Sequence, residues 1–238
     1  MKKAVLFDLD NTLYAYEPAH NAGLEGAKKI LKQEINLAYK KFDTLYELSK
    51  KEIYRELSGT ASAHNKVLHF QRLIEKTHNT VDPRIVLKLY DAYWNNFLKK
   101  MKLRKGAMHV LKTLKKQNLK IAIVSDLTTH IQLRKLKKLK IDKYVDILVT
   151  SEEAGSEKPH AIMFLLTLNK LNLKPTEVFF VGDDLIKDME GANSVGIDSV
   201  YLTKSKVKLA NPDYRKPNYV IREITELLDL INSKKGTN

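Results

Sequence analysis

The alternation of short apolar segments with helical ones limits the fold of this chain more than any other feature. Beyond residue 105, helices are predicted at 106–117, 129–140, 160–171 and 188–195. Each precedes a segment rich in β-branched and aromatic residues, and these lie at 121–124, 147–149, 178–181 and 199–201. A last strand at 219–221 precedes a helix that ends near residue 232. Apolar strands separated by helices indicate a parallel sheet buried on both faces, so we predict an α/β fold with a Rossmann-like core.

One further strand, at residues 3–9, is separated from the others by a long helical block. The block divides into four predicted helices, at about 18–33, 37–57, 62–78 and 81–101. One strand before this block and the remaining strands after it imply a helical subdomain inserted into a sheet domain. We predict a core domain of residues 1–14 and 103–238, a helical domain of residues 15–102, and a frayed tail at 233–238.

The first strand leads directly into two carboxylates. Because side chains alternate along a strand, Asp8 and Asp10 lie on one side and Leu9 on the other. Two like charges this close are costly at the end of a buried strand unless a cation lies between them. A divalent cation would leave one carboxylate to attack an electrophile and the other to move a proton. The alternative is a pair of surface aspartates that cap the next helix.

Polar residues also follow the other strands, where open parallel sheets bind their ligands. They are Thr12 after the first strand, Ser125 and Asp126 after the second, Lys158 after the third, and Asp183, Asp184 and Asp188 after the fourth. An acid pair, a hydroxyl, a lysine and an acid cluster thus reach one edge of the sheet. Simpler interpretations remain for three of them: Ser125 as an incidental strand-end residue, Lys158 as a surface lysine and Asp184 as a solvated loop acid.

The segments FDLDNT, VSD, EKP and VGDDLIKD resemble, in order, the four motifs of the haloacid dehalogenase (HAD) superfamily. The helical insert is similar to the α-helical cap of that superfamily, and the resemblance covers about residues 3–232. It implies a magnesium-dependent phosphatase that hydrolyses a small phosphomonoester through a phospho-aspartate. Sugar phosphates, nucleotides and phosphoglycolate are the implied substrate class. A phosphomutase on the same scaffold is the alternative.

The resemblance also implies roles for the residues that match its motifs. Asp8 would be the nucleophile, and Asp10 would protonate the leaving oxygen and then activate water. The implied ligands of Mg²⁺ are the Asp8 carboxylate, the Asp10 backbone carbonyl and Asp183. The implied phosphate-binding residues are Ser125 and Lys158, and the implied supporting or metal-binding residues are Asp184, Asp188 and Thr12.

Two departures and three helical-domain residues bear on the substrate. Asp126 stands where the family often has Asn, and we expect this extra negative charge to face the cap or a substrate hydroxyl. Dehalogenases of the family lack an acid at the position of Asp10, so this residue favours phosphate chemistry over carbon–halogen cleavage. The candidate substrate contacts in the helical domain are Tyr16, His20 and Arg72.

The net charge of +14 is concentrated in residues 99–143, which hold 15 Lys and Arg against two acids. Leu133, Leu136 and Leu139 recur within a lysine-rich run there, which predicts a helix that buries its leucines and exposes its lysines. The alternative is a nucleic-acid-binding or regulatory protein that uses this basic region. The clustered acids argue against it, because a site without chemistry has no use for costly carboxylates.

The remaining composition describes an ordinary globular chain. The absence of Cys excludes disulfides and thiolate metal sites. We find no signal peptide and no apolar run of membrane-spanning length, so we expect a cytoplasmic location and no membrane partner. The expected partner is a small phosphorylated metabolite, with nucleic acid not expected, and the expected state is a monomer or homodimer.

Overall fold

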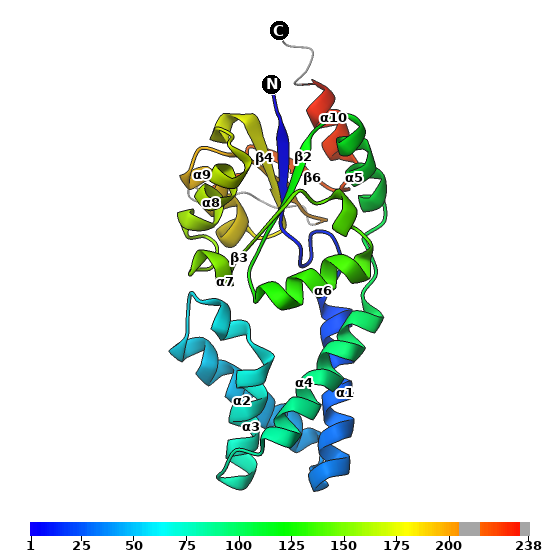
Figure 1. The fold of residues 1–238 in the computed structure, drawn as a ribbon, viewed down its shortest axis with the longest axis vertical. Helices are drawn as coiled ribbons and strands as arrows, with labels where there is room; N and C mark the ends of the chain where they lie inside the picture. Colours follow the sequence, from blue (N-terminus) through cyan, green and yellow to red (C-terminus); the bar gives the residue numbers. More distant parts are fainter. Residues whose placement is uncertain (205–214, 234–238) are drawn as a thin grey trace. The chain divides into compact units, whose positions relative to one another are not determined.

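The structure is a computed structural model that describes residues 1–204 and 215–233 (Figure 1). The chain divides into two compact units. One is Met1–Ala15 together with Lys102–Asn238, and the other is Tyr16–Met101. We refer to them as the sheet unit and the helical unit.

Within residues 1–204 and 215–233, the sheet unit is built on six parallel strands. They are β1 (Ala4–Phe7), β2 (Lys120–Ser125), β3 (Ile147–Thr150), β4 (Val178–Gly182), β5 (Asp198–Leu202) and β6 (Tyr219–Ile221). Their order in the sheet is β3-β2-β1-β4-β5-β6. The predicted α/β fold with a parallel sheet is confirmed. Phe7 of β1 is in register with Ile123 of β2 and Val181 of β4, so the residues that follow these strands emerge at similar heights.

Helices cover both faces of the sheet. They are α5 (Ala107–Lys116), α6 (Thr129–Leu139), α7 (Ser151–Ala154), α8 (Ala161–Leu171), α9 (Gly191–Ser194) and α10 (Glu226–Ser233). Helices α8 and α9 lie on one face, and α5 and α10 lie on the other (Figure 1). Leu6, Phe180 and Met163 belong to the buried cluster on the α8 side, so apolar burial fixes the strands from which the site residues extend.

Two predictions near the ends of elements are corrected. Instead of one helix at 188–195, a π-helical segment, η4 (Leu185–Glu190), precedes α9. Its geometry arises because the amides of both Asp188 and Met189 donate to the carbonyl of Asp184. At the other end, Ser233 belongs to α10 rather than to a frayed tail, and residues 234–238 lie outside the described residues. Two 3-10 turns, η2 (Asp142–Tyr144) and η3 (Pro175–Glu177), complete the elements described in this unit.

The helical unit contains α1 (Tyr16–Ile35), α2 (Tyr39–Glu56), the 3-10 turn η1 (Ala61–His64), α3 (Lys66–His78) and α4 (Pro83–Lys100). The predicted third helix is divided because the Asn65 side chain accepts from Val67 N at 3.0 Å and caps a new helix. Asp82 caps α4 in the same way, followed by Pro83 in its first turn. Among residues 1–204 and 215–233, we find no helix with the length and apolar character needed to cross a membrane.

Candidate active site

The candidate site lies at the carboxyl ends of β1 and β4, where the sheet order reverses. Strands β2 and β3 lie on one side of β1, and β4, β5 and β6 lie on the other. Asp8 directly follows β1, and its amide donates to the Val181 carbonyl of β4 at 2.9 Å. Asp183 directly follows β4. A parallel sheet of this order places ligands at this crevice.

A buried lysine joins two carboxylates at the centre of the site. Lys158 Nζ lies 2.6 Å from Asp8 Oδ1 and 2.7 Å from Asp188 Oδ1, with 4% of the lysine exposed. Burial alone would lower the pKa of Lys158, but the carboxylates of Asp188 and Asp8 raise it well above its usual value. The ammonium group is therefore charged, and it neutralises much of the repulsion between the two acids.

Asp188 is held in place by the backbone that precedes it. Its Oδ2 accepts hydrogen bonds from Asp183 N at 3.0 Å and Asp184 N at 3.1 Å. A Cβ on Gly182 would lie 2.2 Å from that same oxygen, so only glycine allows this approach. Asp188 thus fixes both Lys158 and the start of the loop that carries Asp183.

Three carboxylates form a group that could hold a cation. Oxygens of Asp8, Asp183 and Asp188 lie within 4.8 Å of one another, and Thr12 Oγ1 donates to Asp183 Oδ1 at 3.1 Å. Burial raises the pKa of Asp8, and burial together with the Asp8 charge raises the pKa of Asp183 to about 7. Asp8 and Asp188 are buried and Asp183 is half-buried, and such a group of carboxylate oxygens suits a hard divalent cation such as Mg²⁺. The structure brings together the two carboxylates predicted as metal ligands, Asp8 and Asp183.

Asp184 has a different set of contacts from its neighbour. Its Oδ1 accepts from Ile186 N at 2.8 Å and from Lys187 N at 2.9 Å, so the side chain caps η4. The metal role considered for Asp184 stays a prediction, while capping accounts for its observed bonds.

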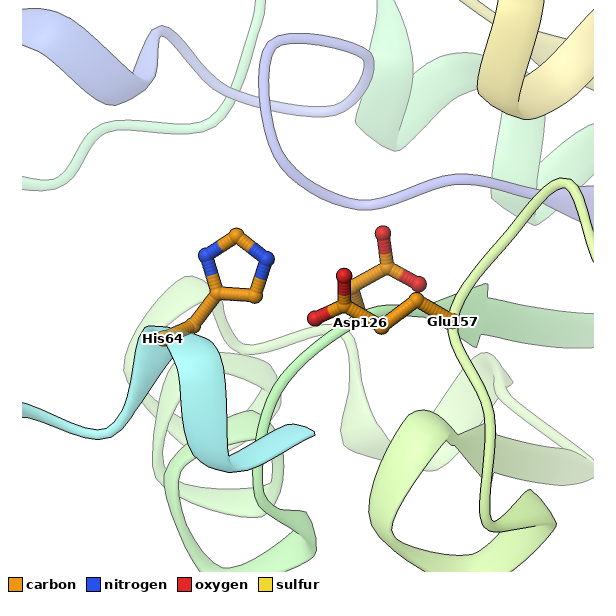
Figure 2. A group of neighbouring side chains, drawn as sticks. All are labelled: His64, Asp126 and Glu157. Atoms are coloured by element: carbon orange, nitrogen blue, oxygen red, sulfur yellow. The ribbon is translucent and has the colours of Figure 1, made fainter. Parts of the chain in front are cut away.

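The residues after β2 form a second group beside Lys158. Gln132 Nε2 donates at 2.7 Å to Ser125 Oγ, which is buried. Asp126 Oδ1 accepts from Lys158 N at 3.0 Å, and its Oδ2 accepts from Lys187 Nζ at 2.8 Å. Figure 2 shows the Asp126 side chain next to that of Glu157.

The extra negative charge of Asp126 is therefore compensated within the sheet unit. Burial would raise its pKa, but Lys158 and Lys187 lower it, so the carboxylate is ionised and paired. Its predicted contact with a cap residue or a substrate hydroxyl stays a prediction.

Asp10 contacts a residue that sequence reasoning missed. Lys135 Nζ lies 2.8 Å from both Asp10 carboxylate oxygens, and Tyr14 Oη donates to Asp10 Oδ1 at 2.7 Å. The predicted exposure of this lysine is wrong: Lys135 is fully buried in α6, and Leu133 is 53% exposed. The position could have been found by spacing, since Lys135 lies four residues from both Ile131 and Leu139, which are buried.

The three predicted contact residues of the helical unit are found in interactions within that unit. His20 Nδ1 lies 2.6 Å from Tyr93 Oη, and the Tyr16 ring stacks on His20 at 5.2 Å. Burial, together with the charges of Lys66 and Lys50, lowers the pKa of His20 to about 3, so its imidazole is neutral. Arg72 of α3 forms ion pairs with Glu52 and Glu56 of α2. Contact of these residues with a substrate stays a prediction.

The raised pKa of Asp183 gives a first prediction. Its folded-state pKa of about 7 lies above the ordinary 3.8, so the folded state holds the extra proton between these values. Stability of the metal-free protein should therefore fall as pH rises from about 4 to about 7. A cation held by Asp183 would have to displace this proton at low pH, so we expect added Mg²⁺ to stabilise the protein more at pH 8 than at pH 5.5. Thermal unfolding with EDTA or with Mg²⁺ at the two pH values measures both effects.

Asp183→Asn is the matched control for this experiment, because it keeps the shape of the side chain and removes the titrating carboxylate. It should lose most of the stabilisation by Mg²⁺ at pH 8. An equal effect of Mg²⁺ at both pH values in the unsubstituted protein would contradict the prediction.

Comparison with known proteins identifies the family. The model of the haloacid dehalogenase-like hydrolases matches residues 5–202. A ribulose-1,5-bisphosphate 5-phosphatase of Halopiger xanaduensis is 38% identical over 98% of this chain and 100% of its own length. A glyceraldehyde 3-phosphate phosphatase of Methanopyrus kandleri is 31% identical over 97% of both chains.

A solved structure agrees with these relatives. The crystal structure of a HAD phosphatase from Thermococcus onnurineus superimposes with a TM-score of 0.76 at 25% identity, over 97% of this chain and 98% of that one. The chain belongs to the haloacid dehalogenase-like hydrolases and, within them, to the phosphatases.

Proposed function

We propose that this protein is a magnesium-dependent phosphatase that hydrolyses a small sugar phosphate through a phospho-aspartate on Asp8. The observation that carries the proposal is the buried ammonium group of Lys158, which contacts the carboxylate predicted to be the nucleophile. The substrate class is supported by the two full-length relatives, whose names both specify a phosphorylated sugar.

The first half of the reaction forms the phospho-enzyme. An Asp8 carboxylate oxygen attacks phosphorus, the bond from phosphorus to the substrate oxygen breaks, and Asp10 gives that oxygen its proton. Lys158 offsets the repulsion between the Asp8 carboxylate and the phosphate dianion, because its charge lies 2.6 Å from Asp8 Oδ1 in a buried site. Ser125 would donate to a phosphate oxygen from its position held by Gln132.

The second half returns Asp8 to its starting state. Water attacks phosphorus, Asp10 takes the proton of that water, and the bond between phosphorus and Asp8 breaks to release inorganic phosphate. Asp10 thus gives one proton and recovers one in each cycle.

The carboxylates of Asp8 and Asp183, with the Asp10 backbone carbonyl, would hold Mg²⁺. The donor set fits, since these are oxygen ligands and the two carboxylates lie in one group. When bound, the ion supplies positive charge beside the phosphate. Asp188 serves this arrangement indirectly, because its bonds to Lys158 and to the amide of Asp183 orient both residues.

The second prediction concerns the nucleophile. Asp8→Asn should abolish phosphate release from every sugar phosphate while the fold is kept, because an amide cannot form the phospho-aspartate. Phosphate release is measured for a panel of phosphomonoesters with Mg²⁺ or with EDTA. Appreciable turnover by Asp8→Asn would contradict the assignment of Asp8. Isomerisation of the sugar phosphate with little phosphate release would favour a phosphomutase instead.

The third prediction concerns Lys158. Lys158→Met should lower kcat by about 10²–10³-fold, because it removes one positioned charge from the transition state. Lys170→Met, a change on the partly exposed face of α8, is the control and should leave kcat unchanged. Unfolding curves for both variants exclude loss of structure as the cause. A loss below tenfold in Lys158→Met would mean that another residue balances the phosphate charge.

A further inference from the structure

The buried lysine of α6 has no part in the reaction as proposed so far. Lys135 occupies a position on the buried side of α6, next to Leu136 and in line with Ile131 and Leu139. Placing a lysine where an apolar residue would pack is costly unless the charge is paired. The buried charge of Lys135 is paired with the Asp10 carboxylate, and we therefore look for its role at Asp10.

The contacts fix the carboxylate in a defined orientation. Lys135 Nζ is 2.8 Å from each Asp10 oxygen, so the ammonium group faces both of them. Tyr14, which is fully buried, donates to Oδ1 at 2.7 Å, and its ring lies 5.7 Å from the same ammonium group. Oδ1 therefore accepts from two donors and Oδ2 from one, so both oxygens of the carboxylate are held in place.

The backbone around Asp10 is also held in place, which adds to the contacts that Lys135 and Tyr14 make with its carboxylate. Tyr14 is bridged to Asp10 and to Leu103, and Arg104 N donates to the Leu13 carbonyl at 2.7 Å. The Arg104 side chain also donates to the Thr12 carbonyl at 2.7 Å. The loop that carries Asp10 is therefore tied down on one side, while the side chain of Asp10 itself is 29% exposed and would otherwise be free to rotate.

We propose that Lys135, together with Tyr14, is a positioning residue that holds the Asp10 carboxylate in the orientation for proton transfer. This inference rests on the proposed function, in which Asp10 gives a proton to the leaving oxygen and takes one from water. A displacement of about 1 Å at such a group can lower the rate about 10²-fold, so contacts that hold the Asp10 carboxylate in place would increase the rate of the reaction.

The fourth prediction separates this role from a purely structural one by the choice of leaving group. A sugar alkoxide needs a proton to depart, whereas 4-nitrophenolate leaves without one. In Lys135→Met, kcat for the best sugar phosphate should fall by about 30-fold or more. With 4-nitrophenyl phosphate, the first release of nitrophenolate in stopped-flow should keep its rate within about threefold, since that step needs no proton.

The same substitution should also slow hydrolysis of the phospho-enzyme, because the attacking water must give its proton to Asp10 in that step. Lys135→Met should therefore show a burst of nitrophenolate equal to the enzyme concentration, followed by slow steady turnover. Lys137→Met is the matched control, because Lys137 is in the same helix and exposed. It should behave as the unsubstituted enzyme with both substrates.

Two results would overturn the inference: an equal loss in the burst and in sugar phosphate turnover, or no loss in either. If Lys135→Met does not fold, Tyr14→Phe decides in the same way, because it removes one donor to Asp10 and keeps the ring. Failure of the proposed function would look different, since the unsubstituted protein would then release no phosphate from any substrate.

Discussion

The structure depends on the burial of positive charge between carboxylates at the end of a parallel sheet. Lys158 lies between Asp8 and Asp188 with almost no exposure to solvent, and breaking such a pair costs several kcal/mol because it leaves a buried charge without compensation. The same arrangement also prepares the acids for binding and catalysis. Exclusion of water strengthens the electrostatic interactions within the site, and the carboxylate oxygens already lie close enough together to accept a cation.

A second pair repeats this arrangement two residues along the chain. Asp8 is balanced by Lys158 from the loop before α8, and Asp10 by Lys135 from α6, so each of the two aspartates after β1 has its own buried lysine. The two pairs suit different tasks. Lys158 would contact the phosphate as well as Asp8, whereas Lys135 would hold Asp10 together with Tyr14. The strongly basic segment of residues 99–143 thus contributes at least one lysine to the interior, which weakens its interpretation as a nucleic-acid surface.

The parallel α/β sheet could be predicted from the sequence, as could the positions at which polar side chains follow its strands. These features follow from local patterns, since apolar periodicity marks the strands and polar residues mark where they end. The role of Lys135 could not be read in this way, because its partner is 125 residues away and a lysine in a basic run suggests exposure. The contact of Asp188 with Lys158 agrees with the supporting role expected for Asp188, whereas the capping of η4 by Asp184 was hidden. That cap belongs to a π-helical turn in which the amides of residues 188 and 189 donate to the same carbonyl, and no periodicity in the sequence indicates such a turn.

In the proposed cycle, Asp10 would give a proton to the leaving oxygen and later take one from water. Both oxygens lie on the side of phosphorus opposite Asp8, so one fixed orientation of the carboxylate would serve both steps. A freely rotating side chain would need to find that orientation twice in each cycle. Lys135 contacts both carboxylate oxygens and Tyr14 donates to Oδ1, so in the proposed cycle the carboxylate would keep its orientation while it loses and regains its proton.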